Sequence, residues 1–502
     1  MRGWVSNTNL ARGLGDAALV LDNGYPTATG LRIRGGRDEY YDTTEGAPIK
    51  TMFTYSAEGV QEFFAANDAK IWNMTSTPAV VVTGQTDGEY SIQQMETSGG
   101  EYLYAVNGTD SPLLYDGSSW SVITAASSPV SITGVTSADL GAVWAYKARL
   151  YFVEALTLSV WYLPADSIGG AATEFSLRGI FEQGGSLLFG TTWSFDAGDG
   201  IDDRWVVVSD LGEVAVYSGS DPGDSAWSIV GRYGLIGSPL GKNAFTRIAG
   251  DVLIATDAGL IPLSAVVQKS PETLSMTAIS YPIEPDWRSE ADARRSIPWE
   301  IRKWPSKGMA IISNPVTAAT DPQCFVLNLQ TGAWARWTGW DVRSMTVHAN
   351  QLYVGTSDGR VFKAESGGTD DGEAFTMQVA MHFNDFGRAA AYKIINLARA
   401  TFRAARAFVP KLSASVNYAQ TFPSAPASPA DFSVDVWDSG LWDAAVWNAS
   451  ETAATVTSRW VSVVGAGYSH AMQVQITSGT TPALDAELMS IDAIFEDGGV
   501  VV

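Results

Sequence analysis

The sequence predicts an all-β fold, and three observations lead to this. Short runs of β-branched and aromatic residues alternate with turns of Gly, Asn and Asp, most clearly in Cys324–Gly372. The 502 residues include 49 Gly, 18 Trp, 18 Tyr and 19 Phe but only 17% charged residues, which suits many short strands. Helical periodicity is sparse, and the best helix candidate is Pro285–Ile301, with Asp286 or Ser289 as its expected N-cap.

A strand–turn–strand unit recurs along the chain. In the clearest copy, Asp358-Gly359 predicts a hairpin turn because Gly tolerates the positive φ that such turns need. Successive units begin roughly 40 to 55 residues apart, which is the spacing of a four-stranded propeller blade rather than of a helical repeat. This predicts a β-propeller of six or seven blades, with a β-sandwich or stacked sandwiches as the alternative. The units are Glu62–Met74, Glu101–Gly117, Ala148–Pro164, Asp203–Gly219, Gly250–Ser264, Gly308–Trp334 and Gln351–Ala364.

The chain divides into three parts. Residues 1–50 are expected to form an N-terminal arm and first strands, and 51–369 the propeller, with room for an insertion at 265–305. The turn-rich joint Gly367–Gly372 follows the last unit. Longer strand-like runs beyond it predict an additional C-terminal β-rich domain at 370–502.

The tryptophans of the C-terminal domain show an unusual spacing. Trp437, Trp442 and Trp447 recur every five residues, which fits neither a strand face nor a helix face. Large rings on a looped segment are typical of anchors that pack on a neighbouring surface. The alternative is that all three belong to an internal core.

The charge is strongly acidic but unevenly distributed. There are 32 basic and 54 acidic residues, a net charge of −22, which argues against a protein that grips nucleic acid through cationic surface. Arg388–Lys411 nevertheless holds six cations and no acid. One interpretation is a solvated strand face that alternates with Ile395, Leu397 and Phe402. The other is a docking surface for an acidic neighbour, such as a second copy of this chain. The docking candidates are Arg388, Lys393, Arg399, Arg403 and Arg406, with Trp437, Trp442 and Trp447.

The sequence contains little that points to catalysis. Its three histidines lie far apart, and the HExxH, CxxC, GxSxG and GxxxxGKS/T motifs are missing, so we expect no enzyme, no metal and no cofactor. The acids around Asp199 lack the D-x-D/N-x-D/N-G order of a calcium loop and read as an acidic turn. Cys324 is the only cysteine, which fits assembly in a reducing cytoplasm. No apolar run reaches the ~20 residues of a membrane span, and the first residues lack the apolar core of a signal peptide.

Several motifs together carry a family resemblance. Leu21–Gly36, LDNGYPTATGLRIRGG, resembles the opening of tail proteins from short-tailed bacteriophages, the family called nozzle, tail hub or packaged-DNA stabilisation protein. The similarity continues in the same order to about residue 450, and region 165–300 departs from it. The further similar parts are Trp299–Pro315, Phe325–Asp341, Leu352–Gly372, the lone Lys393 and the spaced tryptophans of VWDSGLWDAAVW.

The resemblance implies a propeller-bearing, non-enzymatic subunit of a hexameric ring below the portal and its adaptor. Its expected partners are other copies of itself and the portal-adaptor protein, with tail fibres or spikes as further candidates, and its expected location is the virion tail, assembled in the bacterial cytoplasm. An acidic channel would let double-stranded DNA pass without tight binding, because each Lys or Arg contact adds affinity. The candidate channel-lining acids are Asp196, Asp199, Asp202, Asp203, Asp221 and Asp224.

Two other functions fit a propeller. A carbohydrate-binding propeller or glycoside hydrolase is favoured by the 18 Trp, since aromatic faces stack on sugars, and the 54 acids allow many carboxylate pairs. An intracellular scaffold of the WD-repeat kind is the other, although its regular GH…WD signature is missing here.

Overall fold

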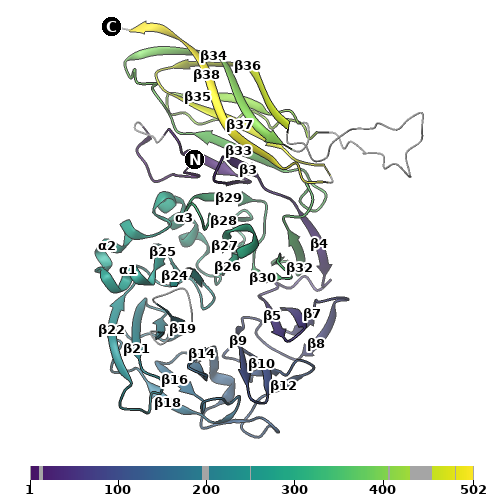
Figure 1. Ribbon diagram of the computed structural model, residues 1–502, viewed down its shortest axis with the longest axis vertical. Helices are drawn as coiled ribbons and strands as arrows, with labels where there is room; N and C mark the ends of the chain where they lie inside the picture. Colours follow the sequence, from purple (N-terminus) through teal and green to yellow (C-terminus); the bar gives the residue numbers. More distant parts are fainter. Residues whose placement is uncertain are drawn as a thin grey trace, which may run out of the picture.

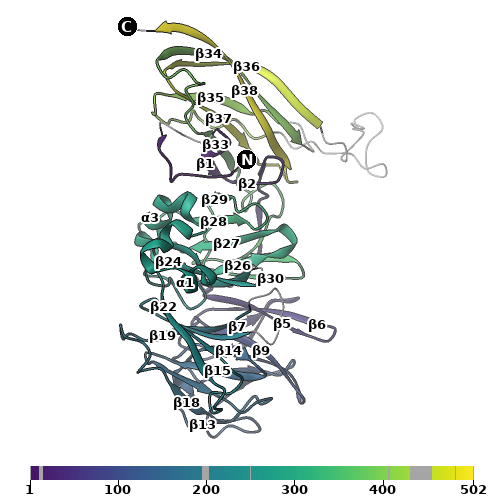
Figure 2. The same ribbon diagram turned by 60° about the vertical axis from the view of Figure 1, so that its left-hand side comes forward.

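The computed structural model describes residues 2–10, 15–194, 203–248, 250–404, 408–429, 455–480 and 482–500. In this part of the chain, seven antiparallel sheets stand around one axis as the blades of a β-propeller (Figure 1). Figure 2 shows the C-terminal domain stacked on the propeller along the long axis of the molecule. The all-β prediction is confirmed, and the number of blades is seven.

Blades 1 to 4 have four strands each, and the first strand of each blade faces the axis. Blade 1 comprises β5 (Thr51–Ala57), β6 (Val60–Ala66), β7 (Lys70–Asn73) and β8 (Ala79–Thr83). Blade 2 comprises β9 (Ser91–Thr97), β10 (Gly100–Val106), β11 (Leu113–Tyr115) and β12 (Trp120–Val122). Blade 3 comprises β14 (Leu140–Tyr146), β15 (Arg149–Glu154), β16 (Ser159–Tyr162) and β18 (Thr173–Ser176), and β13 (Ile132–Thr133) pairs with β17 (Gly170–Ala171) beside it. Blade 4 comprises β19 (Leu187–Trp193), β20 (Arg204–Ser209), β21 (Glu213–Ser218) and β22 (Ser228–Gly234).

Blades 5 to 7 depart from this pattern. Blade 5 has three strands, β23 (Phe245–Ile248), β24 (Asp251–Thr256) and β25 (Gly259–Pro262), and then helices α1 (Leu263–Gln268), α2 (Pro271–Leu274) and α3 (Glu284–Arg294). Blade 6 comprises β26 (Ile301–Trp304), β27 (Met309–Asn314), β28 (Gln323–Asn328) and β29 (Trp334–Thr338). Blade 7 comprises β30 (Ser344–His348), β31 (Gln351–Gly355), β32 (Arg360–Ala364) and, from the N-terminal arm, β4 (Arg37–Asp42). The Asp358-Gly359 turn joins β31 to β32, so the predicted hairpin is confirmed.

The helix expected over Pro285–Ile301 exists but is shorter. It begins at Glu284 and ends at Arg294, and β26 begins at Ile301. The expected caps are wrong, because the N-cap position is Ile283 and makes no side-chain cap. A 3-10 turn over Tyr281–Ile283 leads directly into α3, so the chain is already wound when the helix begins.

Strand β4 closes the ring, since the outermost strand of the last blade comes from the start of the chain. It pairs with β32, and its side chains contact blade 1. The ring of Tyr40 lies 5.9 Å from that of Phe63 and 5.1 Å from that of Tyr353, and its hydroxyl donates to the Met74 carbonyl at 2.6 Å. Closure therefore depends on a strand more than two hundred residues away in sequence from the blade that it completes.

A recurring contact fixes the loop that leads into a blade. An Asp in the turn between the second and third strands accepts a hydrogen bond from a backbone N–H of the loop before the first strand. The pairs are Asp110 with Thr86 at 2.8 Å, Asp210 with Ser186 at 2.9 Å, and Asp257 with Ser238 at 3.2 Å. These carboxylates satisfy loop donors that would otherwise lack a partner, so part of the acidic content is structural.

The C-terminal domain is a two-sheet sandwich continuous with blade 6. Strand β1 (Ala18–Asp22) pairs with β29 on one side and β33 (Thr376–Met381) on the other, which extends the blade through β37 (His470–Thr477) and β35 (Lys411–Val416). The second sheet has the order β2 (Gly24–Pro26), β3 (Leu31–Ile33), β38 (Ala486–Val500), β34 (Ala391–Ala404) and β36 (Thr455–Gly467). Ile395, Ala398, Val463 and Met472 form a core between the sheets.

Candidate functional site

Three segments singled out in the sequence, Leu21–Gly36, Phe325–Asp341 and Leu352–Gly372, meet at one place, the joint between the propeller and the C-terminal domain. Asn328 donates to the Pro26 carbonyl at 2.7 Å, and the indole of Trp337 donates to the Gly24 carbonyl at 3.0 Å. Arg336 pairs with Asp22 at 2.7 Å. These partners lie 302 to 314 residues apart along the chain, so the joint is assembled by tertiary contacts alone.

Arg34 occupies the centre of the joint. Its Nη1 and Nη2 donate to the two carboxylate oxygens of Asp370 at 2.8 and 2.6 Å. Nε donates to Asn23 at 3.0 Å, Nη1 also to the Gly35 carbonyl at 2.9 Å, and Nη2 also to the Thr338 carbonyl at 3.3 Å. All five N–H donors of the guanidinium are thus used.

Aromatic rings enclose this ion pair. The guanidinium carbon of Arg34 lies 3.9 Å from the ring centroid of Phe375 and 4.9 Å from that of Trp340. The Trp340 indole also donates to Asp370 at 3.1 Å. The side chain of Arg34 is fully buried and that of Asp370 is 13% exposed, so water screens the pair little. Arg34 was not a sequence-predicted site residue; the only signal was its position within LRIRGG.

Two glycine-containing segments run side by side at the joint. The Gly36 N–H donates to the Gly367 carbonyl at 3.0 Å, and the Arg37 N–H donates to the Thr369 carbonyl at 2.9 Å. A Cβ atom at position 36 would lie 1.9 Å from the Thr369 oxygen, so only glycine fits there. A cleft of about 670 Å³ opens beside these segments, and its charged lining residues are Asp22, Arg37, Asp370, Asp371 and Glu373.

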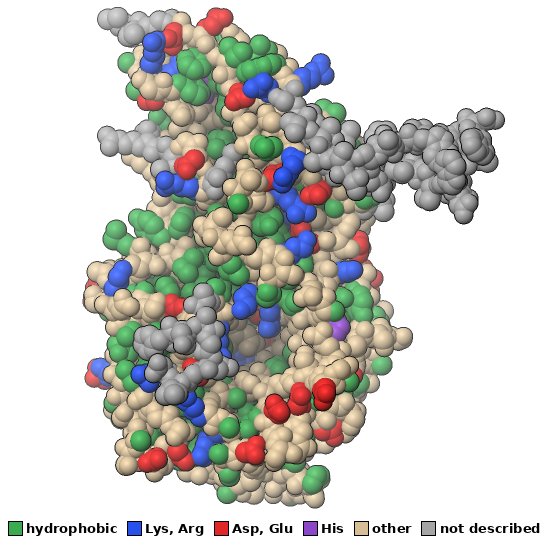
Figure 3. Space-filling model, viewed as in Figure 1, with side chains coloured by type: hydrophobic (Ala, Val, Ile, Leu, Met, Phe, Trp, Pro, Cys, Tyr) green, Lys and Arg blue, Asp and Glu red, His purple; other side chains and the backbone are tan. Residues whose placement is uncertain are grey.

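A second cavity lies on the propeller axis, and we call it the axial pocket (Figure 3). Its volume is about 510 Å³, and it is lined by the first strands of blades 1, 2, 5, 6 and 7. Three of its lining residues are cations, Arg247, Arg302 and Lys303, and Lys and Arg side chains gather around the hollow in Figure 3. The polar and aromatic lining includes Thr51, Thr54, Tyr90, Gln94, Asn243, Phe245, Thr246 and Thr346.

Side chains from blade 5 bridge one end of the axial pocket. The ammonium of Lys242 donates to the carbonyls of Asn107 at 3.3 Å and Gly141 at 3.0 Å, which belong to blades 2 and 3. The Asn243 amide donates to the Tyr90 carbonyl at 3.1 Å. Burial lowers the pKa of Lys242 to about 8. The blades are thereby tied together across the axis.

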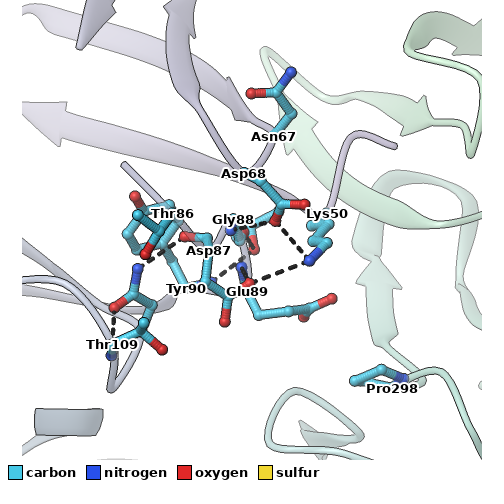
Figure 4. Close-up of polar contacts among 12 residues, drawn as sticks. Lys50, Asn67, Asp68, Thr86, Asp87, Gly88, Glu89, Tyr90, Thr109 and Pro298 are labelled. Atoms are coloured by element: carbon cyan, nitrogen blue, oxygen red, sulfur yellow. Dashed lines mark hydrogen bonds and ion pairs between the residues drawn. The ribbon is translucent and has the colours of Figure 1, made fainter. Parts of the chain in front are cut away.

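Ion pairs surround the same end. Lys50 lies between Asp68 and Asp87, at 2.6 and 3.2 Å (Figure 4). Arg343, just before the first strand of blade 7, pairs with Glu89, just before the first strand of blade 2. Burial lowers the pKa of Arg343 to about 10. These acids neutralise Lys50 and Arg343 at the bridged end of the pocket. The three cations that line the pocket, Arg247, Arg302 and Lys303, lie farther along their strands.

The structure places four of the predicted docking cations, Arg388, Lys393, Arg399 and Arg403, on or beside β34. Arg399 pairs with Asp492 at 2.7 Å, Arg403 pairs with Glu487 at 2.5 Å, and Arg388 pairs with Asp497. All three acids lie on the neighbouring strand β38, so the cationic run is largely matched within its own sheet. These arginine side chains remain between 38% and 64% exposed.

Lys393 differs from the other cations in the run. It is fully buried, and its ammonium donates to the carbonyls of Arg388, Ala391 and Tyr468 at 2.7 to 2.8 Å. Its three donors are satisfied, so it closes the turn before β34 and does not present its charge at a surface. The docking role predicted for it is therefore not available to this side chain.

The predicted channel acids do not form one cluster among the described residues. Asp203 is buried and accepts from the Ser194 hydroxyl at 2.5 Å. Asp221 pairs with Arg149 at 2.7 Å, and Asp224 is exposed. Both lie in the loop between β21 and β22, the two outer strands of blade 4. The remaining predicted residues, Asp196, Asp199, Asp202, Arg406, Trp437, Trp442 and Trp447, lie outside the described residues.

Within the described residues, no group of three or more His, Cys, Asp and Glu side chains could hold a metal ion. None of the described helices is long and apolar enough to cross a membrane.

Comparisons with known proteins gave structural neighbours only. No family model and no curated protein matches the chain. The computationally designed Ika8 protein is similar at a TM-score of 0.36 and 11% identity, over 65% of this chain and 99% of its own. BBS1N, crystallised in complex with ARL6DN and soaked with lead, is similar at a TM-score of 0.41 and 11% identity, over 67% and 99%. At TM-scores this low, neither adds to the architecture already given by the strand order.

Proposed function

We propose that this chain is a nozzle subunit of a short-tailed bacteriophage, one of six that form a ring below the portal adaptor and enclose the DNA exit channel. The observation that carries the proposal is the joint. The segments Leu21–Gly36, Phe325–Asp341 and Leu352–Gly372, which resemble the nozzle family, all contact one another there. Segments that are similar for a shared structural reason are expected to be neighbours in space.

The joint also suits a mechanical role. Blade 6 and half of the C-terminal sandwich belong to one eight-stranded sheet, and a buried ion pair holds the crossing point. Such a connection fixes the propeller relative to the C-terminal domain. A ring that retains a genome under load requires subunits with this kind of fixed geometry.

The DNA path in this proposal runs between subunits and not through a propeller. The axial pocket has a volume of only about 510 Å³, and Lys242 and Asn243 bridge one end of it. A duplex does not fit there, so a channel requires several copies around a common axis. A net charge of −22 favours passage without retention, because the duplex carries a phosphate charge every ~1.7 Å and adheres to basic walls.

The half-exposed arginines of β34 are the described candidates for contacts within the ring. Arg388 and Arg399 can exchange their own acids for acids of a neighbouring subunit at little cost, since exposed ion pairs contribute only ~0–1 kcal/mol. Arg403 differs, because its partner Glu487 is only 6% exposed and would be left buried without its cation. Reversing the charge of Arg388 and Arg399 together is expected to leave the chain folded and to reduce tail assembly.

Cryo-electron microscopy of virions that carry this protein tests the proposal. A sixfold ring of this chain between the portal adaptor and the tail tip is expected, with negative potential along its channel. A ring of another order, a basic channel wall, or absence of the protein from the tail would contradict it.

A further inference from the structure

We propose that copies of this chain join edge to edge through the second sheet of the C-terminal sandwich, with β36 of one copy beside β38 of the next. The partner at each edge is therefore a second copy of this chain. This contact deepens the proposed ring and rests on that proposal for the number of copies. Two strand edges without a partner, and the side chains along them, carry it.

Both long edges of this sheet are free among the described residues. Strand β36 is last in the sheet and pairs only with β34, so one side of its 13 residues carries no ladder. Strand β38 has 15 residues, but β3 pairs with only Glu487 and Leu488. Figure 2 shows β36 at one margin of the C-terminal domain. Each edge thus offers the backbone groups of about a dozen residues to another strand.

The two edges fit each other in direction and length. Strand β34 lies between them and is antiparallel to both, so β36 and β38 run the same way. A copy placed beside β36 therefore presents its β38 in parallel, and its own β36 stays free for the next copy. Such a head-to-tail contact closes into a ring when the rotation per copy allows it. Six copies with three long strands each give about 18 strands, and closed sheets of about that number enclose an aqueous channel.

Apolar side chains are exposed along both edges. On β36, Trp460 is 39% exposed and Val464 is 89% exposed. On β38, Met489 is 43% exposed and Ile494 is 46% exposed, and Phe495 is only partly buried beside the core between the sheets. A strand added at each edge covers these side chains, which a single subunit leaves in water.

The charges along the edges favour the β36–β38 contact over contacts between like edges. The only charged residue of β36 is Arg459, which is exposed and has no acidic partner in the described chain. Beyond its pairing with β3, β38 carries three acids and no cation: Asp492, Glu496 and Asp497. Two β36 edges would bring cations together and two β38 edges would bring acids together, whereas β36 beside β38 joins opposite signs. A second copy therefore suits both edges at once.

Cysteine cross-linking of the full chain tests the contact. Ser462 of β36 and Ile494 of β38 both pair with Leu397 of β34, so they lie level with each other but two strands apart. Neighbouring strands are ~4.8 Å apart, so the variant Ser462→Cys, Ile494→Cys is too far apart for a disulfide within one copy. Ser462→Cys with Glu496→Cys tests a register shifted by two residues. The native Cys324 is fully buried and does not take part.

Brief oxidation of a double variant at millimolar chain concentration is expected to give a series of linked chains, while the single variants give none. Dimers from a single variant would show that like edges pair and would overturn the head-to-tail contact. Monomer alone from both double variants would overturn it as well. A sixfold tail ring whose copies do not meet at these edges would refute only the edge contact, and linked chains from a protein absent from tails would refute only the nozzle.

Val464→Lys and its control Leu156→Lys add the same charge at equally exposed positions, 89% and 90%. Val464 lies on β36, whereas Leu156 lies in the turn between β15 and β16 of blade 3. A lysine on an exposed edge strand opposes strand addition, so Val464→Lys is expected to weaken self-association in sedimentation equilibrium by roughly tenfold or more. Leu156→Lys should leave self-association unchanged, and equal effects of the two variants would overturn the edge contact.

Discussion

Replacing Arg34 by Met should destabilise the joint between the propeller and the C-terminal domain. The change removes the guanidinium between Phe375 and Trp340 but keeps a long unbranched side chain there. Asp370 then retains the Trp340 indole and loses both of its charged hydrogen bonds. Because its side chain is only 13% exposed, water cannot replace them fully.

The magnitude follows from this burial. Removing one partner of a buried ion pair typically costs about 3–5 kcal/mol, because the other charge remains unpaired. Arg2 provides the matched control, since its pair with Asp16 is 61% and 57% exposed. Arg2→Met is expected to cost at most about 1 kcal/mol. The double variant Arg34→Met, Asp370→Leu should recover part of the loss, because it removes the unpaired carboxylate.

Urea unfolding followed by tryptophan fluorescence measures the free energy of unfolding of each variant. Limited proteolysis between residues 364 and 376 reports whether the joint opens. If the two domains unfold separately, two transitions will be seen. Arg34→Met should then lower the urea midpoint of the transition in which the joint opens. A loss for Arg34→Met no larger than that for Arg2→Met would refute the assignment of the joint as the main connection.

Three further outcomes are expected. Gly36→Ala should lower the melting temperature sharply, because the added Cβ would lie 1.9 Å from the Thr369 oxygen. Gly179→Ala is the control and should leave the melting temperature unchanged, because open space surrounds Gly179. Equal shifts of the two variants would contradict the close approach at Gly36. Tyr40→Phe should lower the free energy of unfolding in urea by about 1 kcal/mol, because it removes only the hydroxyl's hydrogen bond. Tyr40→Ala should lower it clearly more, because it also removes the ring that packs across the closing strand β4. A similar loss for both variants would show that this packing does not stabilise the ring. Burial lowers the pKa of Lys242 from 10.5 to about 8, so the unfolded chain binds the extra proton between these values. The cost of the buried charge is therefore fully present below pH 8, and stability should rise by at most roughly 3 kcal/mol towards pH 10.5, a rise that Lys242→Met should flatten.

The sequence itself determined the local structure. Alternating strands and glycine turns predicted an all-β chain, and Asp358-Gly359 marked a hairpin, because both depend on neighbouring residues and their φ preferences. The helix at 284–294 was also local, but its missing side-chain cap was not, since the preceding 3-10 turn sets the start of the helix.

The tertiary structure alone decided which distant residues meet. No local pattern assigns β4 to the last blade, because the pairing of β4 with β32 spans most of the chain. The same holds for Arg34 and Asp370, 336 residues apart, and for the cations of the axial pocket, which come from different blades. The cationic run of β34 looked unpaired in the sequence because its acids lie on β38, 84 to 109 residues later. Charge composition is a property of the sequence, but whether a charge is paired, buried or available depends on which strands become neighbours.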